Sequence, residues 1–226
     1  MIERKLLGTG NIPGGGGELK LWSRALKGGD EFSIMLGGTE LMNSRKSGSE
    51  EALATLACEQ ILSGANPRLL IGGLGMGFTL RAALPLLPDD AVIVVAELVP
   101  AVVDWARGPM AELYGGSLED PRVNIRLEDV AASINVADAG YDAILLDVDN
   151  GPDGLTHTGN EAIYSHAGLK AARRALRTNG VLAVWSSAPD PGFTRRLKEC
   201  GFAVREAKAR AHGKRGGHHV IWLATK

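Results

Sequence analysis

Cysteines and aromatic residues are scarce in this sequence, and neither sign of charge dominates. The 226 residues include two cysteines, Cys58 and Cys200, and aromatic residues make up 5% of the chain. Both cysteines fall in segments with helical character, so we interpret them as reduced packing residues rather than as a disulfide or a metal site. The formal net charge of -1 gives no overall signature of a nucleic-acid-binding protein.

Long apolar runs are also missing, which excludes further classes of protein. No run of about 18 apolar residues occurs, so the sequence predicts no membrane span. The N-terminal stretch MIERKLLGTGNIPGGGGE lacks the apolar centre of a signal peptide, and we expect a cytoplasmic protein. The histidines show no metal-ligand spacing, and we predict no bound metal. They are His157, His166, His212, His218 and His219.

The apolar residues that are present follow an α/β pattern. From Leu69 onwards, continuous runs such as LLIGG, VIVVAE and AILLD predict parallel strands that are buried on both faces. The last two strand-like runs, FAVREAKAR and HHVIWLATK, have no helix between them and predict an antiparallel hairpin. This arrangement resembles the Rossmann-like fold of the methyltransferases, a mostly parallel seven-stranded sheet with a reversed C-terminal hairpin strand.

Two domains are expected from the change of pattern along the chain. Residues 1–48 contain the short strand-like runs ELKLWSR, EFSIML and TELM, which predict a small β-hairpin or meander. Residues 49–226 form the expected Rossmann-like domain. Its helices are predicted from SEEALATLACEQIL, capped by Ser49, from PAVVDWARGPMAELYG, and from a long segment that Gly180 ends.

Glycines gather where the first parallel strand should turn into a helix. The segment LLIGGLGMGF spaces them as Gly73-x-Gly75-x-Gly77. Glycine weakens regular structure, so its use here indicates that a ligand approaches the backbone above a helix N-terminus. The dinucleotide fingerprint needs glycine or alanine where Phe78 stands, which disfavours a pyrophosphate. A tight strand-to-helix turn without a ligand remains the alternative.

Acidic residues follow the next two predicted strands. Glu97 ends VIVVAE, directly before Leu98, and its carboxylate suits the two hydroxyls of a ribose. Asp129 follows Glu128 after the third strand and suits an adenine amino group, although an N-cap role for Asp129 fits equally well. Because the carboxyl ends of parallel strands share one edge of the sheet, these residues predict a slot for an adenosyl group.

Asp147 ends the fourth predicted strand, and around it a family resemblance becomes specific. The run from Glu31 to Ile221 resembles the spermidine synthase (polyamine aminopropyltransferase) family. LLIGGLGMG is similar to its glycine-rich loop, VVAELVPAVV to its ribose-binding segment, LEDVAAS to its adenine-binding segment, and LLDVDNGPDGL to its gate loop. The resemblance implies a class I methyltransferase fold, a homodimer, and S-adenosylmethionine or its decarboxylated form as the cofactor.

The resemblance also assigns roles to residues near the fourth strand. Asp147 falls on the catalytic aspartate, while Asp149 and Asn150 would position the acceptor, and Tyr164 would close over the site or pack in a helix. The cofactor-binding set has eight members, and Asp147 belongs to it as well. They are Gly73, Gly75, Gly77, Glu97, Leu98, Glu128, Asp129 and Asp147.

Departures from the family pattern bear on the reaction. Leu74 stands in place of the loop aspartate, and the segment before the glycines has no tyrosine or histidine to hold a diamine. These departures favour methyl transfer to a small, amine-bearing acceptor over aminopropyl transfer from the decarboxylated cofactor, which is the alternative. Two further alternatives are a catalytically inactive adenosyl-binding protein and an RNA-binding methyltransferase. The latter would use the basic stretch REAKARAHGKRGGHH, which is otherwise a solvated hairpin.

Overall fold

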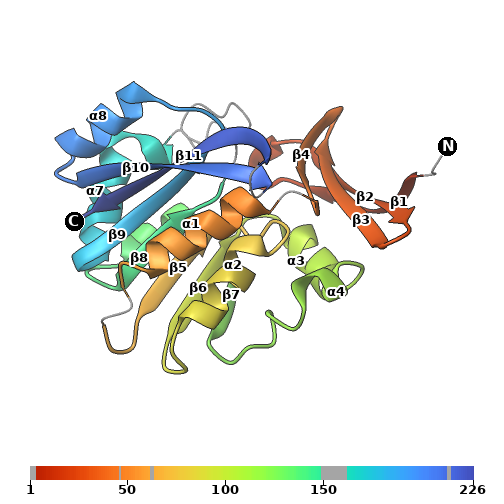
Figure 1. Ribbon diagram of the computed structural model, residues 1–226, viewed down its shortest axis with the longest axis horizontal. Coiled ribbons are helices and arrows are strands. Elements are labelled where there is room, and N and C mark those ends of the chain that lie inside the picture. The colour runs from red at the N-terminus through yellow and green to blue at the C-terminus, as the bar shows by residue number, and fades with distance from the viewer. Residues whose placement is uncertain (1–3, 46, 62–63, 149–161, 213–214) are drawn as a thin grey trace.

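Two β-sheets organise the structure, which is a computed structural model (Figure 1). It describes residues 4–45, 47–61, 64–148, 162–212 and 215–226. The larger sheet has seven strands in the order β10-β11-β9-β8-β5-β6-β7, and the smaller has four in the order β1-β2-β3-β4. The predicted α/β fold with a separate N-terminal β segment is therefore confirmed.

The small sheet is an antiparallel meander. Its strands are β1 (Arg4–Asn11), β2 (Glu18–Leu26), β3 (Gly29–Leu36) and β4 (Thr39–Asn43), with the 3-10 turn η1 (Pro13–Gly15) between the first two. The sequence analysis missed β1. Two glycines let this strand lie on the helix that contains Ala101 and Trp105, because a Cβ at Gly8 would lie 2.6 Å from Trp105 Nε1 and one at Gly10 would lie 2.3 Å from Ala101 Cβ.

The large sheet is parallel from β7 to β9 and antiparallel from β9 to β10. The parallel strands are β5 (Arg68–Gly72), β6 (Val92–Glu97), β7 (Val123–Leu127), β8 (Tyr141–Leu146) and β9 (Leu176–Ser186). The strands β10 (Ala203–His212) and β11 (Arg215–Thr225) form the predicted C-terminal hairpin. Strands β5 and β8 are buried almost throughout, as expected for parallel strands covered on both faces.

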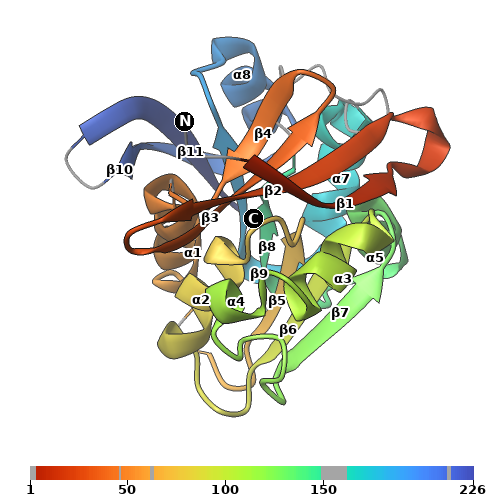
Figure 2. The same ribbon diagram turned by 90° about the vertical axis from the view of Figure 1, so that its right-hand side faces the viewer.

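Helices cover both faces of the large sheet (Figures 1 and 2). One face carries α1 (Gly48–Cys58), α2 (Phe78–Ala83), η2 (Leu84–Leu86), α3 (Pro100–Arg107) and α4 (Ala111–Tyr114). The other carries α5 (Val130–Val136), α7 (His166–Ala175) and α8 (Pro191–Glu199). The small sheet shares an apolar cluster with the first set, through Leu19, Leu21, Phe32 and Ile34. None of the helices in the described ranges is long and apolar enough to cross a membrane.

Helix α1 begins one residue earlier than predicted, and its cap is different. Ser47 occupies the N-cap position without a side-chain hydrogen bond, so the prediction that Ser49 caps the helix is wrong. The Ser49 side chain is buried inside the first turn, where its hydroxyl donates to Glu50.

Two other predicted helices are shorter than the sequence indicated. The predicted helix after β6 is broken at Gly108, because Pro109 disfavours helical backbone in the residue before it. The helix predicted to run to Gly180 ends at Ala175, and β9 already starts at Leu176. The last turn of α7 is closed by the backbone amides of Ala139 and Gly140, which donate to its carbonyls.

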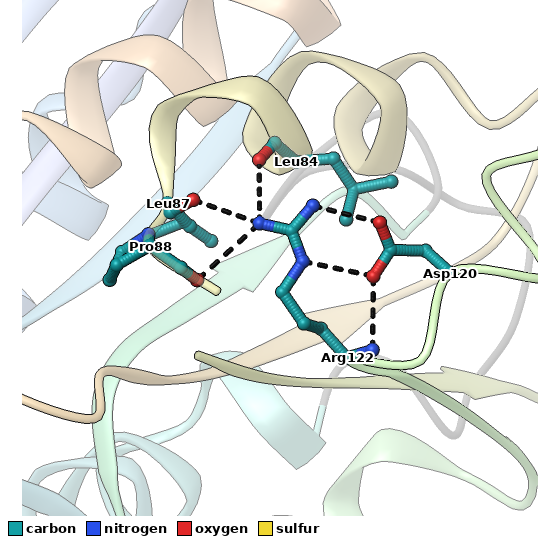
Figure 3. Close-up of polar contacts among 5 residues, drawn as sticks. All are labelled: Leu84, Leu87, Pro88, Asp120 and Arg122. Atoms are coloured by element: carbon teal, nitrogen blue, oxygen red, sulfur yellow. Dashed lines mark hydrogen bonds and ion pairs between the residues drawn. The ribbon is translucent and has the colours of Figure 1, made fainter. Parts of the chain in front are cut away.

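An arginine network fastens the amino-terminal edge of the parallel sheet (Figure 3). The Arg122 guanidinium forms a two-pronged ion pair with Asp120 at 2.8 and 2.9 Å. Its remaining nitrogen, Nη1, donates to the carbonyls of Leu84 at 3.1 Å and Leu87 at 2.8 Å. This network joins the start of β7 to the end of η2, at the edge opposite to the carboxyl ends of the strands.

Candidate active site

The glycine loop joins the carboxyl end of β5 to α2. Gly73, Gly75 and Gly77 have φ values of +91°, +52° and +76°, which favour glycine strongly. Packing adds a second requirement, since a Cβ at Gly77 would lie 2.4 Å from the Tyr114 ring and one at Gly73 would lie 2.8 Å from the Asp147 carbonyl oxygen. The close approach that the sequence indicated is therefore made in part by the protein itself.

Two buried side chains hold the glycine loop through hydrogen bonds to its backbone. The Glu97 carboxylate accepts hydrogen bonds from the backbone amides of Leu74 and Val99, each at 2.8 Å. The Tyr114 hydroxyl donates to the Gly75 carbonyl at 2.7 Å. Both side chains are buried, and burial raises the pKa of the Glu97 carboxyl above its ordinary value although the amide donors lower it. We call Glu97 and Tyr114 the loop clamp.

A pocket of about 880 Å³ opens beside Glu97, and we call it the Glu97 pocket. Its polar lining comes from the carboxyl ends of the strands, through Glu97, Asp129 and Asp147. The small sheet supplies the facing apolar wall. The residues of that wall are Ile12, Leu19, Ile34, Leu36, Leu41 and Met42. The two carboxylates that the sequence analysis placed at one slot, Glu97 and Asp147, thus line one pocket.

A second pocket, of about 730 Å³, lies on the other side of Asp147. Its polar lining includes Glu50 and Thr79, and its apolar lining includes Met76 and Trp185, so we call it the Glu50 pocket. The two pockets share a boundary that includes Asp147. The shared residues are Leu41, Met42, Gly73, Gly75 and Asp147.

Asp147 has the electrostatics of a proton acceptor near neutral pH. It directly follows β8, and its carboxylate accepts a hydrogen bond from the Thr79 hydroxyl at 3.0 Å. Burial raises the pKa of Asp147 to about 7, the negative charge of Glu50 adds to the rise, and the Thr79 hydrogen bond opposes it. A carboxylate with such a pKa can both attract an amine and take its proton.

Glu50 is one of the site residues that sequence reasoning missed. It lies in the first turn of α1, where an acidic residue is ordinary because the helix dipole favours it. Its side chain is half-buried and accepts a hydrogen bond from the Ser49 hydroxyl at 2.6 Å. Burial raises the pKa of Glu50 as well. Only the tertiary packing of α1 beside the glycine loop reveals its place in the pocket.

Comparisons with known proteins indicate the family that this chain resembles. A scan against models of protein families gives no match. A polyamine aminopropyltransferase from Mycobacterium tuberculosis is 32% identical over 165 residues, which cover 71% of this chain and 30% of that protein. A crystal structure of spermidine synthase in complex with the transition state analogue AdoDATO aligns with a TM-score of 0.73 and 20% identity, over 98% of this chain and 72% of that one.

This chain is spermidine synthase-like. A further relative, putrescine N-methyltransferase 4 from Nicotiana tabacum, is 37% identical over 120 residues, which cover 52% of this chain and 29% of that protein. The matched part of the chain thus spans about a third or less of the length of these curated relatives.

The other predicted site residues of this spermidine synthase-like chain lie in different surroundings. Asp129 lines the Glu97 pocket and also caps α5, accepting from the Ala131 amide at 2.8 Å, so the two roles considered for it are compatible. Leu98 lines the same pocket. Glu128 instead accepts from the Ser133 hydroxyl and pairs with Arg126 at 3.7 Å, and it is absent from the described lining of both pockets.

The segment after Asp147 is described only in part. Asp149 and Asn150 lie outside the described residues of this spermidine synthase-like chain. Tyr164 is buried and packs edge-to-face on Phe193, with ring centroids 5.6 Å apart. Its hydroxyl donates to the Val148 carbonyl at 3.3 Å. Tyr164 therefore packs in a helix, which was one of the two roles considered for it. Its hydrogen bond to Val148 holds the backbone next to Asp147.

Proposed function

We propose that this chain transfers an aminopropyl group from decarboxylated S-adenosylmethionine to a small amine. The observation that carries the proposal is the position of Asp147 on the boundary shared by the two pockets. A donor in the Glu97 pocket and an acceptor in the Glu50 pocket would meet beside this carboxylate. The similarity to polyamine aminopropyltransferases supports the aminopropyl group rather than the methyl group that the sequence analysis favoured.

The Glu97 pocket suits the adenosyl part of the donor. Each carboxylate oxygen of Glu97 accepts one backbone amide and has a second lone pair, which leaves capacity for the two ribose hydroxyls. The apolar side chains Ile34 and Val130 line the same pocket and offer surfaces for the purine ring. Asp129, exposed at the start of α5, would accept from the adenine amino group.

The reaction would be a direct displacement at carbon. The lone pair of the acceptor amine attacks the CH2 group next to the sulfonium, a C–N bond forms, and the C–S bond breaks with its electron pair left on sulfur. The neutral thioether methylthioadenosine departs, and the new ammonium group gives its extra proton to the Asp147 carboxylate. Burial and the Glu50 charge raise the pKa of Asp147 to about 7, which brings the basicity of this carboxylate closer to that of an amine and makes it a better proton acceptor than an ordinary aspartate.

Methyl transfer to an amine is the second candidate. The similarity to a putrescine N-methyltransferase favours it, because that relative has the highest identity of those reported above, over about half of this chain. The same two pockets would serve this reaction, with the amine attacking the methyl carbon of S-adenosylmethionine instead of the aminopropyl carbon.

Product analysis separates these candidates. The purified chain is incubated with a diamine and either donor, and mass spectrometry identifies aminopropylated or methylated diamine. Aminopropylated product supports the proposal, and methylated product alone would replace it by the second candidate. Asp147→Asn should abolish either product, whereas the exposed control Asp104→Asn should keep it. Binding of adenosyl ligands by calorimetry without any product would indicate the inactive adenosyl-binding alternative.

Assembly and nucleic-acid binding stay separate predictions. The homodimer rests on the resemblance to the spermidine synthases, and light scattering after size exclusion tests it. The RNA-binding alternative rests on the basic C-terminal hairpin, and filter binding at two salt concentrations tests it.

A further inference from the structure

We infer that Glu50 makes the site selective for a ligand that places a primary ammonium group, and no carboxylate, beside Asp147. The inference rests on the proposed function and deepens it, because it names the charge pattern of the substrate. In this chain Glu50 of α1 would supply the negative charge that the glycine loop lacks, because Leu74 stands where the resemblance expects an aspartate.

The lining of the Glu50 pocket carries negative charge only. Glu50 and Asp147 are its two charged residues, and no lysine, arginine or histidine occurs among its described lining residues. The glycine loop contributes apolar side chains here, Leu74 and Met76, including the residue at the position where the sequence resemblance expects an aspartate. The acid of this pocket is therefore supplied by α1.

The two carboxylates are held in place by hydroxyl groups rather than by cations. Ser49 donates to Glu50 at 2.6 Å, and Thr79 donates to Asp147 at 3.0 Å. A neutral donor fixes a carboxylate without cancelling its charge, so the pair keeps its attraction for a cation from the ligand. The two groups interact, since the charge of Glu50 contributes to the raised pKa of Asp147.

Trp185 completes an environment that suits an alkylammonium. Its side chain lines the same pocket, and its indole Nε1 is buried with no hydrogen-bond partner in the described part of the structure. An aromatic wall offers apolar surface to the methylene groups of a ligand and attraction to its cationic end. By contrast, a ligand carboxylate would place a third negative charge among groups of low solvent exposure, which Coulomb repulsion opposes.

Three thioether probes isolate the charge of the ligand. They share the adenosyl group and a neutral sulfur and differ in the tail: 5′-(3-aminopropylthio)adenosine carries an ammonium, 5′-propylthioadenosine carries no charge, and S-adenosylhomocysteine carries an ammonium and a carboxylate. Calorimetry measures each dissociation constant with the wild-type chain. We expect the ammonium probe to bind about tenfold more tightly than either of the others.

Two neighbouring variants assign the preference to one side chain. Glu50→Gln keeps the shape and removes the charge, and the matched control Glu51→Gln changes an exposed glutamate in the same helical turn. Glu50→Gln should lower the affinity for the ammonium probe about tenfold and leave that for the propyl probe unchanged, while Glu51→Gln changes neither. The same titrations with 1,4-diaminobutane and 1,4-butanediol on methylthioadenosine-loaded protein test whether the ammonium belongs to the acceptor.

The outcomes distinguish a failure of this inference from a failure of the proposed function. A loss confined to the ammonium probe or to the diamine supports the inference and identifies the donor or the acceptor as its source. Equal wild-type affinity for all three thioethers, with no effect of Glu50→Gln on the diamine, overturns the inference and leaves adenosyl binding intact. No binding of any thioether by the wild-type chain overturns the proposed function as well.

Discussion

Replacing Asp147 by asparagine should stabilise the ligand-free protein at alkaline pH while it abolishes group transfer. The folded-state pKa of Asp147 is about 7, above its ordinary value of 3.8, with burial as the first cause and the charge of Glu50 as the second. Between these two values the folded state binds more protons than the unfolded state, so the free energy of unfolding falls as the pH rises. Above about pH 7 the whole penalty is present. Asparagine, which does not ionise, removes it.

The magnitude follows from the same two pKa values. At 1.36 kcal/mol for each pKa unit, the rise from 3.8 to about 7 corresponds to roughly 4 kcal/mol. The side chain is partly open to its pockets, and solvent screening reduces this figure, so we expect about 2 kcal/mol. For a chain of this length, that gain raises the melting temperature by about 4 to 8 °C.

Thermal unfolding of the ligand-free proteins, followed by circular dichroism, measures this effect. Near pH 8.5, well above the folded-state pKa of about 7, Asp147→Asn should melt above the wild type, and near pH 4 the two should coincide. Asp104→Asn, on the exposed side of α3, should show no such pH-dependent difference. A variant that is no more stable than the wild type near pH 8.5 would refute the claim that the ionised Asp147, buried beside the negative charge of Glu50, destabilises the folded protein.

Three further substitutions test the loop clamp and the frame of the sheet. Tyr114→Phe removes the 2.7 Å bond to the Gly75 carbonyl and should raise the dissociation constant for adenosyl ligands about fivefold in calorimetry, at about 1–2 kcal/mol in stability. Gly77→Ala combines a φ of +76° with a Cβ 2.4 Å from the Tyr114 ring, and urea unfolding should show a loss of roughly 3 kcal/mol. Arg122→Met should cost about 2–3 kcal/mol in urea, because the Asp120 carboxylate loses its partner, but leave adenosyl affinity unchanged. A changed affinity for Arg122→Met, or unaltered affinity for Tyr114→Phe, would contradict these assignments.

The centre of the large sheet could be predicted because β5, β6 and β8 are continuous apolar runs, which are typical of parallel strands buried on both faces. The ends of the helices and strands were harder to predict where helical and extended sequence patterns overlap. The segment after α7 contains no glycine or proline before Gly180, so the sequence does not mark the end of the helix at Ala175, where the amides of Ala139 and Gly140 accompany its last turn. Strand β1 lacked a clear alternation, since Gly8 and Gly10 replace side chains where the strand lies on α3.

The residues of the candidate site also fall into those that the sequence predicts and those whose position depends on tertiary packing. Glu97 and Asp147 could be predicted to lie near each other because the ends of parallel strands meet at one edge whatever the helices do, and both line the Glu97 pocket. Glu50 was not found, because its place in the pocket depends on how α1 packs beside the glycine loop, and a glutamate in the first turn of a helix carries no distinguishing pattern. Tyr114 belongs to the same class: only the fold brings its ring beneath Gly77.

The loop clamp changes how variants of the site are to be read. Glu97 holds the amides of Leu74 and Val99 before any ligand arrives, so Glu97→Gln would place an amide donor against one of these amides and disturb the loop. A loss of affinity in that variant therefore mixes the ribose contact with loop geometry. Tyr114→Phe disturbs the loop through Gly75 alone. If Glu97 acted on ligands only through the loop, the double variant Glu97→Gln/Tyr114→Phe would bind adenosine ligands no more weakly than Glu97→Gln does. If it also contacts the ribose, a 2′-deoxy ligand should lose affinity for the wild type and for Tyr114→Phe, and lose much less for Glu97→Gln.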